Sequence, residues 1–151
     1  MSNLVEQIND SLTSEIATAL GATYSELDFI WDVSKNRFNQ NEKRYGVRPM
    51  AMESTNQINK KYSVDQGFEV IVTTDYYNRE DDESQRAAVF EVYDQMDIII
   101  KNIHKKKAGL PSLVFNTMPF SVDEIEFLED DGSTVAVLRA QFIINYRADL
   151  V

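Results

Sequence analysis

The sequence contains no cysteine, a single histidine, and glycines that are isolated from one another. The absence of cysteine excludes disulfide bonds, thiolate nucleophiles and zinc sites built on cysteine. Because the five glycines are scattered, the sequence contains no glycine-rich phosphate-binding loop. His104 has no second imidazole as a partner, so we expect a surface residue near a helix end. The sequence therefore offers no positive case for an enzyme, and we expect no cofactor.

Long apolar runs are also missing. Apolar stretches such as Ala87–Phe90 and Val135–Leu138 are far too short to span a bilayer, so we expect no membrane partner. The first ten residues, MSNLVEQIND, carry acids where a secretory signal needs cations followed by an apolar block. We therefore expect the protein to begin in the cytoplasm of the cell that makes it.

Basic residues are scarce relative to acidic ones. The chain has 15 Lys and Arg against 25 Asp and Glu, a net charge of −10, which disfavours general nucleic-acid binding. The acids cluster at Glu80–Glu83 and Asp123–Asp131. Neither cluster has the alternating spacing of a calcium loop, so we expect no metal site. Each is interpreted as a solvated segment, or alternatively as a surface that repels phosphate or meets a basic partner.

The residues that are present predict one domain over 1–151 with two amphipathic helices. The chain has 151 residues, of which 43% are hydrophobic, enough for a sizeable core. Apolar residues recur every four positions from Leu4 to Leu20, which predicts a helix over Asn3–Leu20 that ends at Gly21. A second helix is predicted over Glu83–His104 from one apolar stripe. The stripe comprises Val89, Val92, Met96, Ile99 and Ile103.

Alternating polar and apolar residues predict strands in the remaining sequence. The clearest are within Tyr24–Ser34, Gly67–Tyr77 and Thr134–Leu150, with a frayed strand after Pro49 and a short strand that ends before Pro119. Asp131–Gly132 is typical of a hairpin turn. We predict an α+β domain with an antiparallel or mixed sheet, two helices packed on one face, and a long loop after the first strand.

That loop, Lys35–Pro49, ends in the stretch NQNEKRYGVRP, which concentrates cations in an acidic chain. Gly46 is expected to permit a turn, Pro49 to hold the chain extended, and Tyr45 to anchor the loop. Tyr45 beside Arg44 is also compatible with stacking on nucleic-acid bases, although the net charge argues against it.

The stretches NRFNQNEKRYGVRP, FEVIVTTDYYNREDD, QRAAVFEVYDQMDIIIKNI and VAVLRAQFIINYR together resemble the tail terminator and tail completion proteins of tailed bacteriophages. The resemblance covers most of the chain and rests on element order, length and the style of the closing strand.

The resemblance implies a non-enzymatic virion protein of the tail or neck, assembled in the host cytoplasm. Such proteins form a ring, usually a homohexamer, that stops polymerisation of the tail tube protein and offers a docking surface to the head–tail connector. In contractile tails they also contact the sheath protein, and DNA is only cargo that passes through the channel. Another neck or head–tail joining component, and a small adaptor module, remain open as alternatives.

A closed ring needs two different surfaces that fit each other head to tail. We predict that the basic loop of one subunit meets acidic segments of the next, which would fix the register of assembly. The acids alternatively line the channel and keep DNA from sticking. The candidate interface residues are Arg37, Lys43, Arg44, Tyr45, Arg48, Glu80, Asp81, Asp82, Asp130 and Asp131, with Lys35 and Glu129 beside them.

Overall fold

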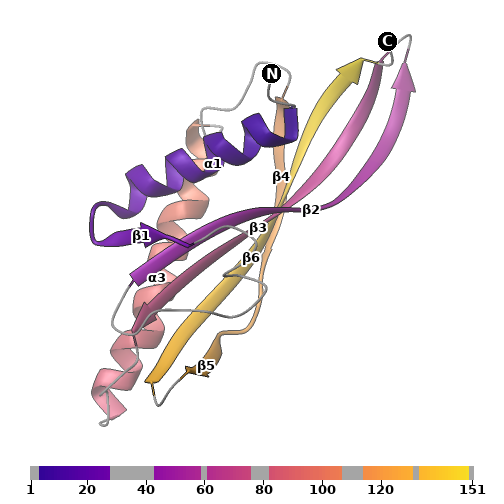
Figure 1. Ribbon diagram of the computed structural model, residues 1–151. Helices are drawn as coiled ribbons and strands as arrows, with labels where there is room; N and C mark the ends of the chain where they lie inside the picture. Colours follow the sequence, from indigo (N-terminus) through magenta and orange to yellow (C-terminus); the bar gives the residue numbers. More distant parts are fainter. Residues whose placement is uncertain are drawn as a thin grey trace.

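The chain folds into two helices packed on one face of a six-stranded mixed sheet (Figure 1). The computed structural model describes residues 4–27, 43–58, 61–75, 82–106, 114–130 and 133–149, and for some residues at the ends of elements it describes the backbone alone. The predicted α+β class is therefore confirmed. The predicted residues Asn3, Lys35, Arg37, Glu80, Asp81 and Asp131 lie outside the described residues.

Helix α1 (Leu4–Leu20) follows the predicted four-residue repeat. Ile8, Leu12 and Ile16 are buried and line up on the face that meets the sheet. Gly21 ends the helix with φ of 82°, and its amide donates to the carbonyl of Ala17 at 3.0 Å. This is the left-handed C-terminal position for which glycine is favoured, as the sequence predicted.

Helix α3 (Asp82–Lys106) extends slightly beyond the predicted Glu83–His104. Val92, Met96, Ile99 and Ile103 are buried as predicted, and Ala88 completes the stripe one position before the expected Val89. Both helices therefore contribute to one apolar core between the helical layer and the sheet.

The sheet has the strand order β1-β2-β3-β6-β4, with β5 pairing a different part of β6. Among the described strands, β1 and β2 are the one pair that is parallel. The strands are β1 (Tyr24–Glu26), β2 (Lys43–Ile58), β3 (Lys61–Asp75), β4 (Val114–Val122), β5 (Glu126–Asp130) and β6 (Ser133–Asp149). Asp130 pairs with Ser133, which is the register of a two-residue hairpin and confirms the turn predicted there.

The segment Lys43–Pro49 is strand and not loop, which corrects the predicted extent of the loop. It pairs with β3 from Arg44 opposite Thr73 to Pro49 opposite Phe68. Tyr45 and Val47 are buried in the core while Arg44 and Arg48 alternate onto the other face. The strand is stabilised by pairing with residues that are distant in the sequence. The polar composition of the segment gives no indication of this pairing.

One other boundary differs from the prediction, and the extent of the first predicted strand is tested only over residues 24–27. The first strand covers only Tyr24–Glu26 among the described residues, and Asp28–Ser34 lie outside them. Strand β4 continues through Pro119 to Val122. Its pairing with β6 is irregular between Thr117 and Phe120, and proline is tolerated at such a bulge on a strand at the sheet edge.

The outer parts of β2, β3 and β6 continue past the helices as a three-stranded arm (Figure 1). We define the arm as residues 50–58, 61–67 and 143–149. Its inner part still contributes Val64, Ile144 and Tyr146 to the core and is flanked by β4, and only its outer end is three-stranded and extends past the helices. The arm begins at a β-bulge where Met50 and Ala51 oppose Gly67. The buried Gln66 side chain donates to the carbonyls of Met50 at 2.8 Å and Gly67 at 2.9 Å. A bulge increases strand twist, so it directs the arm away from the body.

Candidate functional site

Of the cations predicted to contact a neighbouring subunit, the three that the structure describes, Lys43, Arg44 and Arg48, have partners within the same chain. Lys43 forms an ion pair with Glu91 of α3, and its Nζ lies 6.0 Å from the centroid of the Tyr24 ring. Glu91 also accepts a hydrogen bond from Thr74 Oγ1 at 3.2 Å. Lys43 therefore joins β2 to α3 across the core edge.

Arg44 lies on the opposite face of β2, where its Nη2 donates to the carbonyl oxygen of Glu26 at 2.7 Å. Leu27 donates its amide to the Tyr45 carbonyl at 2.8 Å, just after β1 ends. These contacts hold the short strand β1 against β2, so Arg44 has a structural role irrespective of any contact with a partner.

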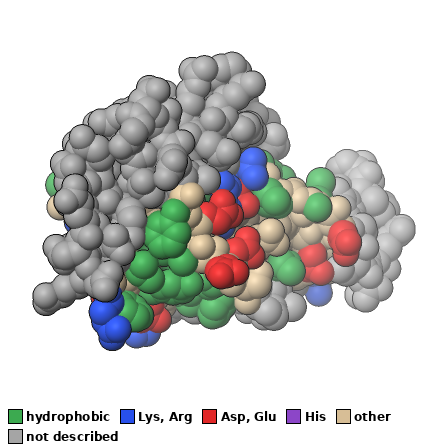
Figure 2. Space-filling view, turned by 90° about the horizontal axis from the view of Figure 1, so that it is seen from below, with side chains coloured by type: hydrophobic (Ala, Val, Ile, Leu, Met, Phe, Trp, Pro, Cys, Tyr) green, Lys and Arg blue, Asp and Glu red, His purple; other side chains and the backbone are tan. Residues whose placement is uncertain are grey.

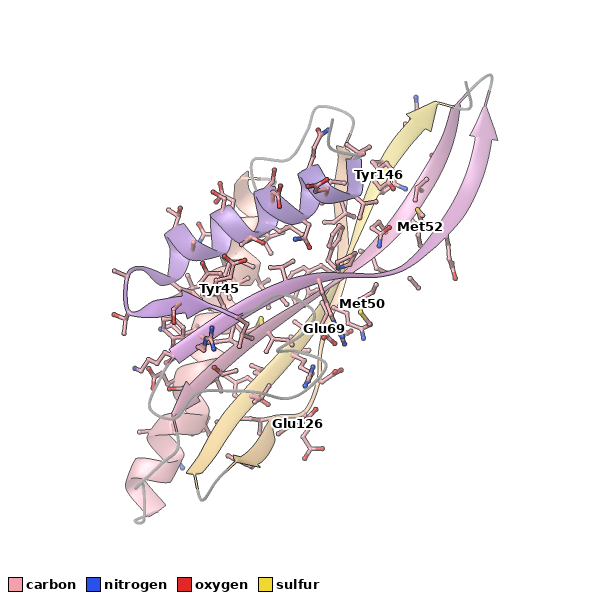
Figure 3. The ribbon with its side chains drawn as sticks, viewed as in Figure 1. Tyr45, Met50, Met52, Glu69, Glu126 and Tyr146 are labelled. Carbon is pink, nitrogen blue, oxygen red and sulfur yellow. The ribbon has the colours of Figure 1, made fainter. Side chains whose placement is uncertain are left out.

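Arg48 belongs to an ion network on the sheet face away from the helices. Its Nε donates to Glu69 Oε1 at 2.8 Å, and Arg139 Nη1 lies 3.4 Å from the same oxygen. Glu126 Oε1 is 3.6 Å from Arg139 Nε. The Glu69 side chain is 6% exposed, whereas that of Glu126 is 47% exposed. The network thus ties together β2, β3, β6 and β5, and Figure 3 labels its two acids.

Tyr45 is buried in the core, as expected of an anchor, although it anchors a strand. Burial, and secondarily the negative charge of Glu26, raise the pKa of its hydroxyl above 10.0. The hydroxyl therefore stays protonated and can donate a hydrogen bond at neutral pH.

The predicted acidic partners of the basic segment are placed only in part. Asp82 begins α3, where a negative charge complements the helix dipole, and Asp130 ends β5. Only the backbone of these two residues is described, and Asp81 and Asp131 lie outside the described residues. The pairing of basic and acidic segments between subunits stays a prediction.

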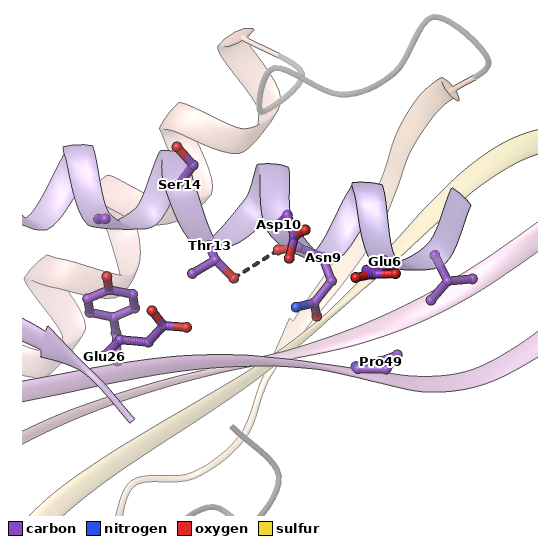
Figure 4. Close-up of a pocket in the computed structure, with 10 residues that line it drawn as sticks. Glu6, Asn9, Asp10, Thr13, Ser14, Glu26 and Pro49 are labelled. Atoms are coloured by element: carbon purple, nitrogen blue, oxygen red, sulfur yellow. Dashed lines mark hydrogen bonds between the residues drawn. The ribbon is translucent and has the colours of Figure 1, made fainter. Parts of the chain in front are cut away.

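A groove of about 790 Å³ lies along α1, and the sequence did not predict it (Figure 4). Its wall is the flank of α1, on which residues repeat every three or four positions. Its floor is formed by residues on the core-facing side of β1 and β2. The lining comprises Val5, Glu6, Asn9, Asp10, Thr13, Ser14, Ala17, Glu26, Tyr45 and Pro49.

The groove exists because β1 is short. β1 pairs only with Lys43–Tyr45, so from Gly46 onward β2 has no neighbour on its outer side among the described strands. The flank of α1 therefore lies over the outer margin of β2, where no further described strand extends the floor. The spacing of polar residues along α1 was the only feature of the sequence that pointed to this groove. The same spacing occurs on any helix flank that faces solvent, so it does not predict a groove.

Among the residues that the structure describes, the charged residues that line the groove are all acidic: Glu6, Asp10 and Glu26. Asn9 Oδ1 is buried and has no hydrogen-bond partner within the described part of the chain. An unmatched buried acceptor has lost its hydration without replacement, and a donor from a ligand would compensate it. The groove can therefore bind a group that is cationic and rich in hydrogen-bond donors.

Several large hydrophobic side chains are exposed on the described part of the chain. Seen from below, hydrophobic side chains gather in one area beside several acidic ones (Figure 2). The large exposed hydrophobic residues are Met50, Met52, Phe90, Tyr93, Ile98, Phe120, Phe127 and Ile143. These residues are distributed over β2, α3, β4, β5 and β6, so they do not by themselves define one docking surface.

Within the ranges that the structure describes, no three His, Asp or Glu side chains are grouped so that they could hold a metal ion. No described helix combines the length and apolar character needed to cross a membrane.

Comparison with known proteins adds no family to this geometry: no protein-family model matches the chain, and no curated protein sequence matches it.

Proposed function

We propose that this protein is a structural virion component of a tailed bacteriophage, a subunit of the ring at the head-proximal end of the tail. The proposal starts from the resemblance in the sequence and is supported chiefly by one structural feature, the three-stranded arm. The outer end of the arm extends beyond the helix-covered body (Figure 1), while its inner part, with Val64, Ile144 and Tyr146, shares the core. A subunit with two distant and different surfaces can assemble head to tail into a closed ring.

The side chains on the arm support this role. Met52 is 57% exposed and Met50 is 37% exposed, close to the place where the arm leaves the body. Tyr146 donates its hydroxyl hydrogen bond to Met52 Sδ at 3.5 Å, so one exposed methionine is held in position (Figure 3). Flexible, polarisable methionines suit a surface that adapts to a partner.

The ring would stop polymerisation of the tube protein and present a docking surface to the head–tail connector. A sheath protein would be a further partner in a contractile tail. DNA would pass through the channel as cargo, and the net charge of −10 would limit its adhesion to the wall.

The test combines self-assembly with tube termination. We expect the purified chain to give hexameric rings in native mass spectrometry and negative-stain images, and to shorten tubes when added to polymerising tube protein. Met52→Glu should weaken ring formation, because it places a charge on the arm. Ile98→Glu is the matched control, since Ile98 is also partly exposed but lies on α3.

A chain that stays monomeric at high concentration and leaves tube length unchanged would overturn the proposal. The groove beside α1 then favours the second candidate, a small non-enzymatic adaptor that binds a cationic partner.

A further inference from the structure

We infer that the groove beside α1 binds the lysine-rich end of α3 from a second copy of this chain. The inference rests on the proposed self-assembly and names the surfaces that carry it. The cationic segment comprises Lys105 and Lys106, the last two residues of α3, together with Lys107.

The chemistry of the groove selects a cation. The charged residues of its described lining are all acidic, and Asn9 Oδ1 adds a buried acceptor without a described partner. Val5, Ala17 and Pro49 add apolar surface beside these acceptors. A lysine side chain matches both features, because its methylene stem covers apolar surface while its ammonium group donates three hydrogen bonds.

The charges of the chain are segregated along the sequence in a way that fits this pairing. Residues 1–34, which include α1 and β1, carry six acids and neither Lys nor Arg. Residues 98–122, which include the end of α3, carry four lysines and no acid. The rest of the chain therefore carries a net charge of −14, since −10 minus +4 is −14. The lysine segment is a local exception, and complementary fields of this kind fix register between partners.

The positions of the two surfaces favour contact between copies. α3 packs against α1 on the core side, whereas the groove is lined by α1, β1 and β2 and by no described residue of α3 (Figure 4). Donor and acceptor surfaces are therefore different patches of one subunit. Such a heterologous contact closes into a ring when the rotation between neighbours permits.

The test reverses the charges of the groove, then those of the lysine segment, and then both together. Glu6→Lys with Asp10→Lys changes the groove, and both residues are exposed, so the fold should tolerate them. Lys105→Glu with Lys106→Glu changes the donor segment. Each pair of substitutions should weaken self-association by about tenfold or more, and combining all four should restore it. The readout is sedimentation velocity over a concentration series at low and at moderate salt.

Two matched controls separate this contact from general charge effects. Glu15→Lys changes an α1 acid that does not line the groove, and Lys101→Glu changes an α3 lysine that is already paired with Asp97 at 2.7 Å. Neither control should weaken association by more than about twofold, because surface charges at a distance are screened.

The outcomes distinguish the inference from the proposed function. Rings that form equally well in the groove variants would overturn the inference and leave the ring function standing. A wild-type chain that never assembles would overturn the ring function, and binding of a synthetic peptide covering residues 101–109 would then decide about the groove. The inference requires that this peptide bind the wild-type protein and not the variant with Glu6→Lys and Asp10→Lys. A peptide that does not bind the wild-type protein would overturn it.

Discussion

Replacing Glu69 by Gln should destabilise the fold more than any change to the exposed acids around it. Glu69 is the shared partner of Arg48 and Arg139, with contacts of 2.8 and 3.4 Å to a single carboxylate oxygen. Its side chain is 6% exposed, and it lies in the middle strand of the network. The substitution keeps the shape of the side chain and removes its charge. The loss in the free energy of unfolding therefore reports the electrostatic contribution of the Glu69 carboxylate.

The size of the expected stability loss depends on how exposed the two arginine partners of Glu69 are. Hydrogen bonds to charged groups contribute ~1.5–3 kcal/mol, and breaking a fully buried ion pair costs ~3–5 kcal/mol. The Arg48 side chain is 25% exposed and that of Arg139 is 14% exposed, so both can recover some hydration. Arg139 also retains Glu126 at 3.6 Å. We therefore expect a loss of about 2 kcal/mol in the free energy of unfolding, or about 4–8 °C in Tm for a chain of this size.

Urea denaturation at two protein concentrations measures this loss and separates folding from assembly. Glu126→Gln is the control, because its side chain is 47% exposed and should cost at most about 0.5 kcal/mol. The difference between the two variants should persist at high salt, since buried pairs are screened less than exposed ones. Equal losses for the two variants would refute the reasoning, because they would mean that Glu69 is as well hydrated as Glu126.

Two further predictions concern backbone fit and pH. Gly67→Ala should cost about 1–3 kcal/mol, because its new Cβ would lie 3.2 Å from the Ala51 carbonyl oxygen at the base of the arm. Gly21→Ala should cost about 1 kcal/mol from the positive φ alone, since no atom lies within 4 Å of the added Cβ. Thermal unfolding measures both losses, and hydrogen exchange should show that Gly67→Ala loosens the arm whereas Gly21→Ala does not. The raised pKa of Tyr45 contributes stability that is fully present below pH 10.0 and is lost as pH rises above it toward the folded-state pKa, so the wild type should lose more stability in that range than Tyr45→Phe. Absorbance titration of tyrosinate should show one late-titrating group that this variant lacks.

Local periodicity explains which elements could be predicted from the sequence. Helix α3 and the apolar face of β6 each carry a sustained pattern over many residues, and burial follows that pattern. In β6 the alternation from Ala136 to Tyr146 marks one buried face, as predicted. The opposite face includes Val137, which is fully buried, and Ile143, which is 40% exposed. This face is therefore partly covered, and β6 is an interior strand with β3 on one side and β4 and β5 on the other.

Pairing between distant residues explains what could not be predicted. The start of β2 looks like a polar loop because three of its side chains are cations, yet each cation has a partner from elsewhere in the chain or from the preceding strand. Arg48 meets Glu69 only because β2 and β3 adopt the register that places them opposite each other. A single sequence shows the charges but not this register. The groove was missed for a related reason, since it depends on where β1 ends.

The outer edges of β2 and β4 limit how a neighbouring copy can dock. Beyond Tyr45 the outer edge of β2 contains Pro49 and two bulges, and the outer edge of β4 contains Pro119 beside a bulge. Proline removes an edge donor, and bulges bend the strand, so both edges are poor templates for adding a strand from another chain. We therefore expect copies to meet through side chains, at the arm and in the groove beside α1, and not by extending the sheet. Charge reversal in the groove is accordingly a cleaner test of assembly than reversal of Arg48, which would place a second carboxylate against buried Glu69 and disturb the fold itself.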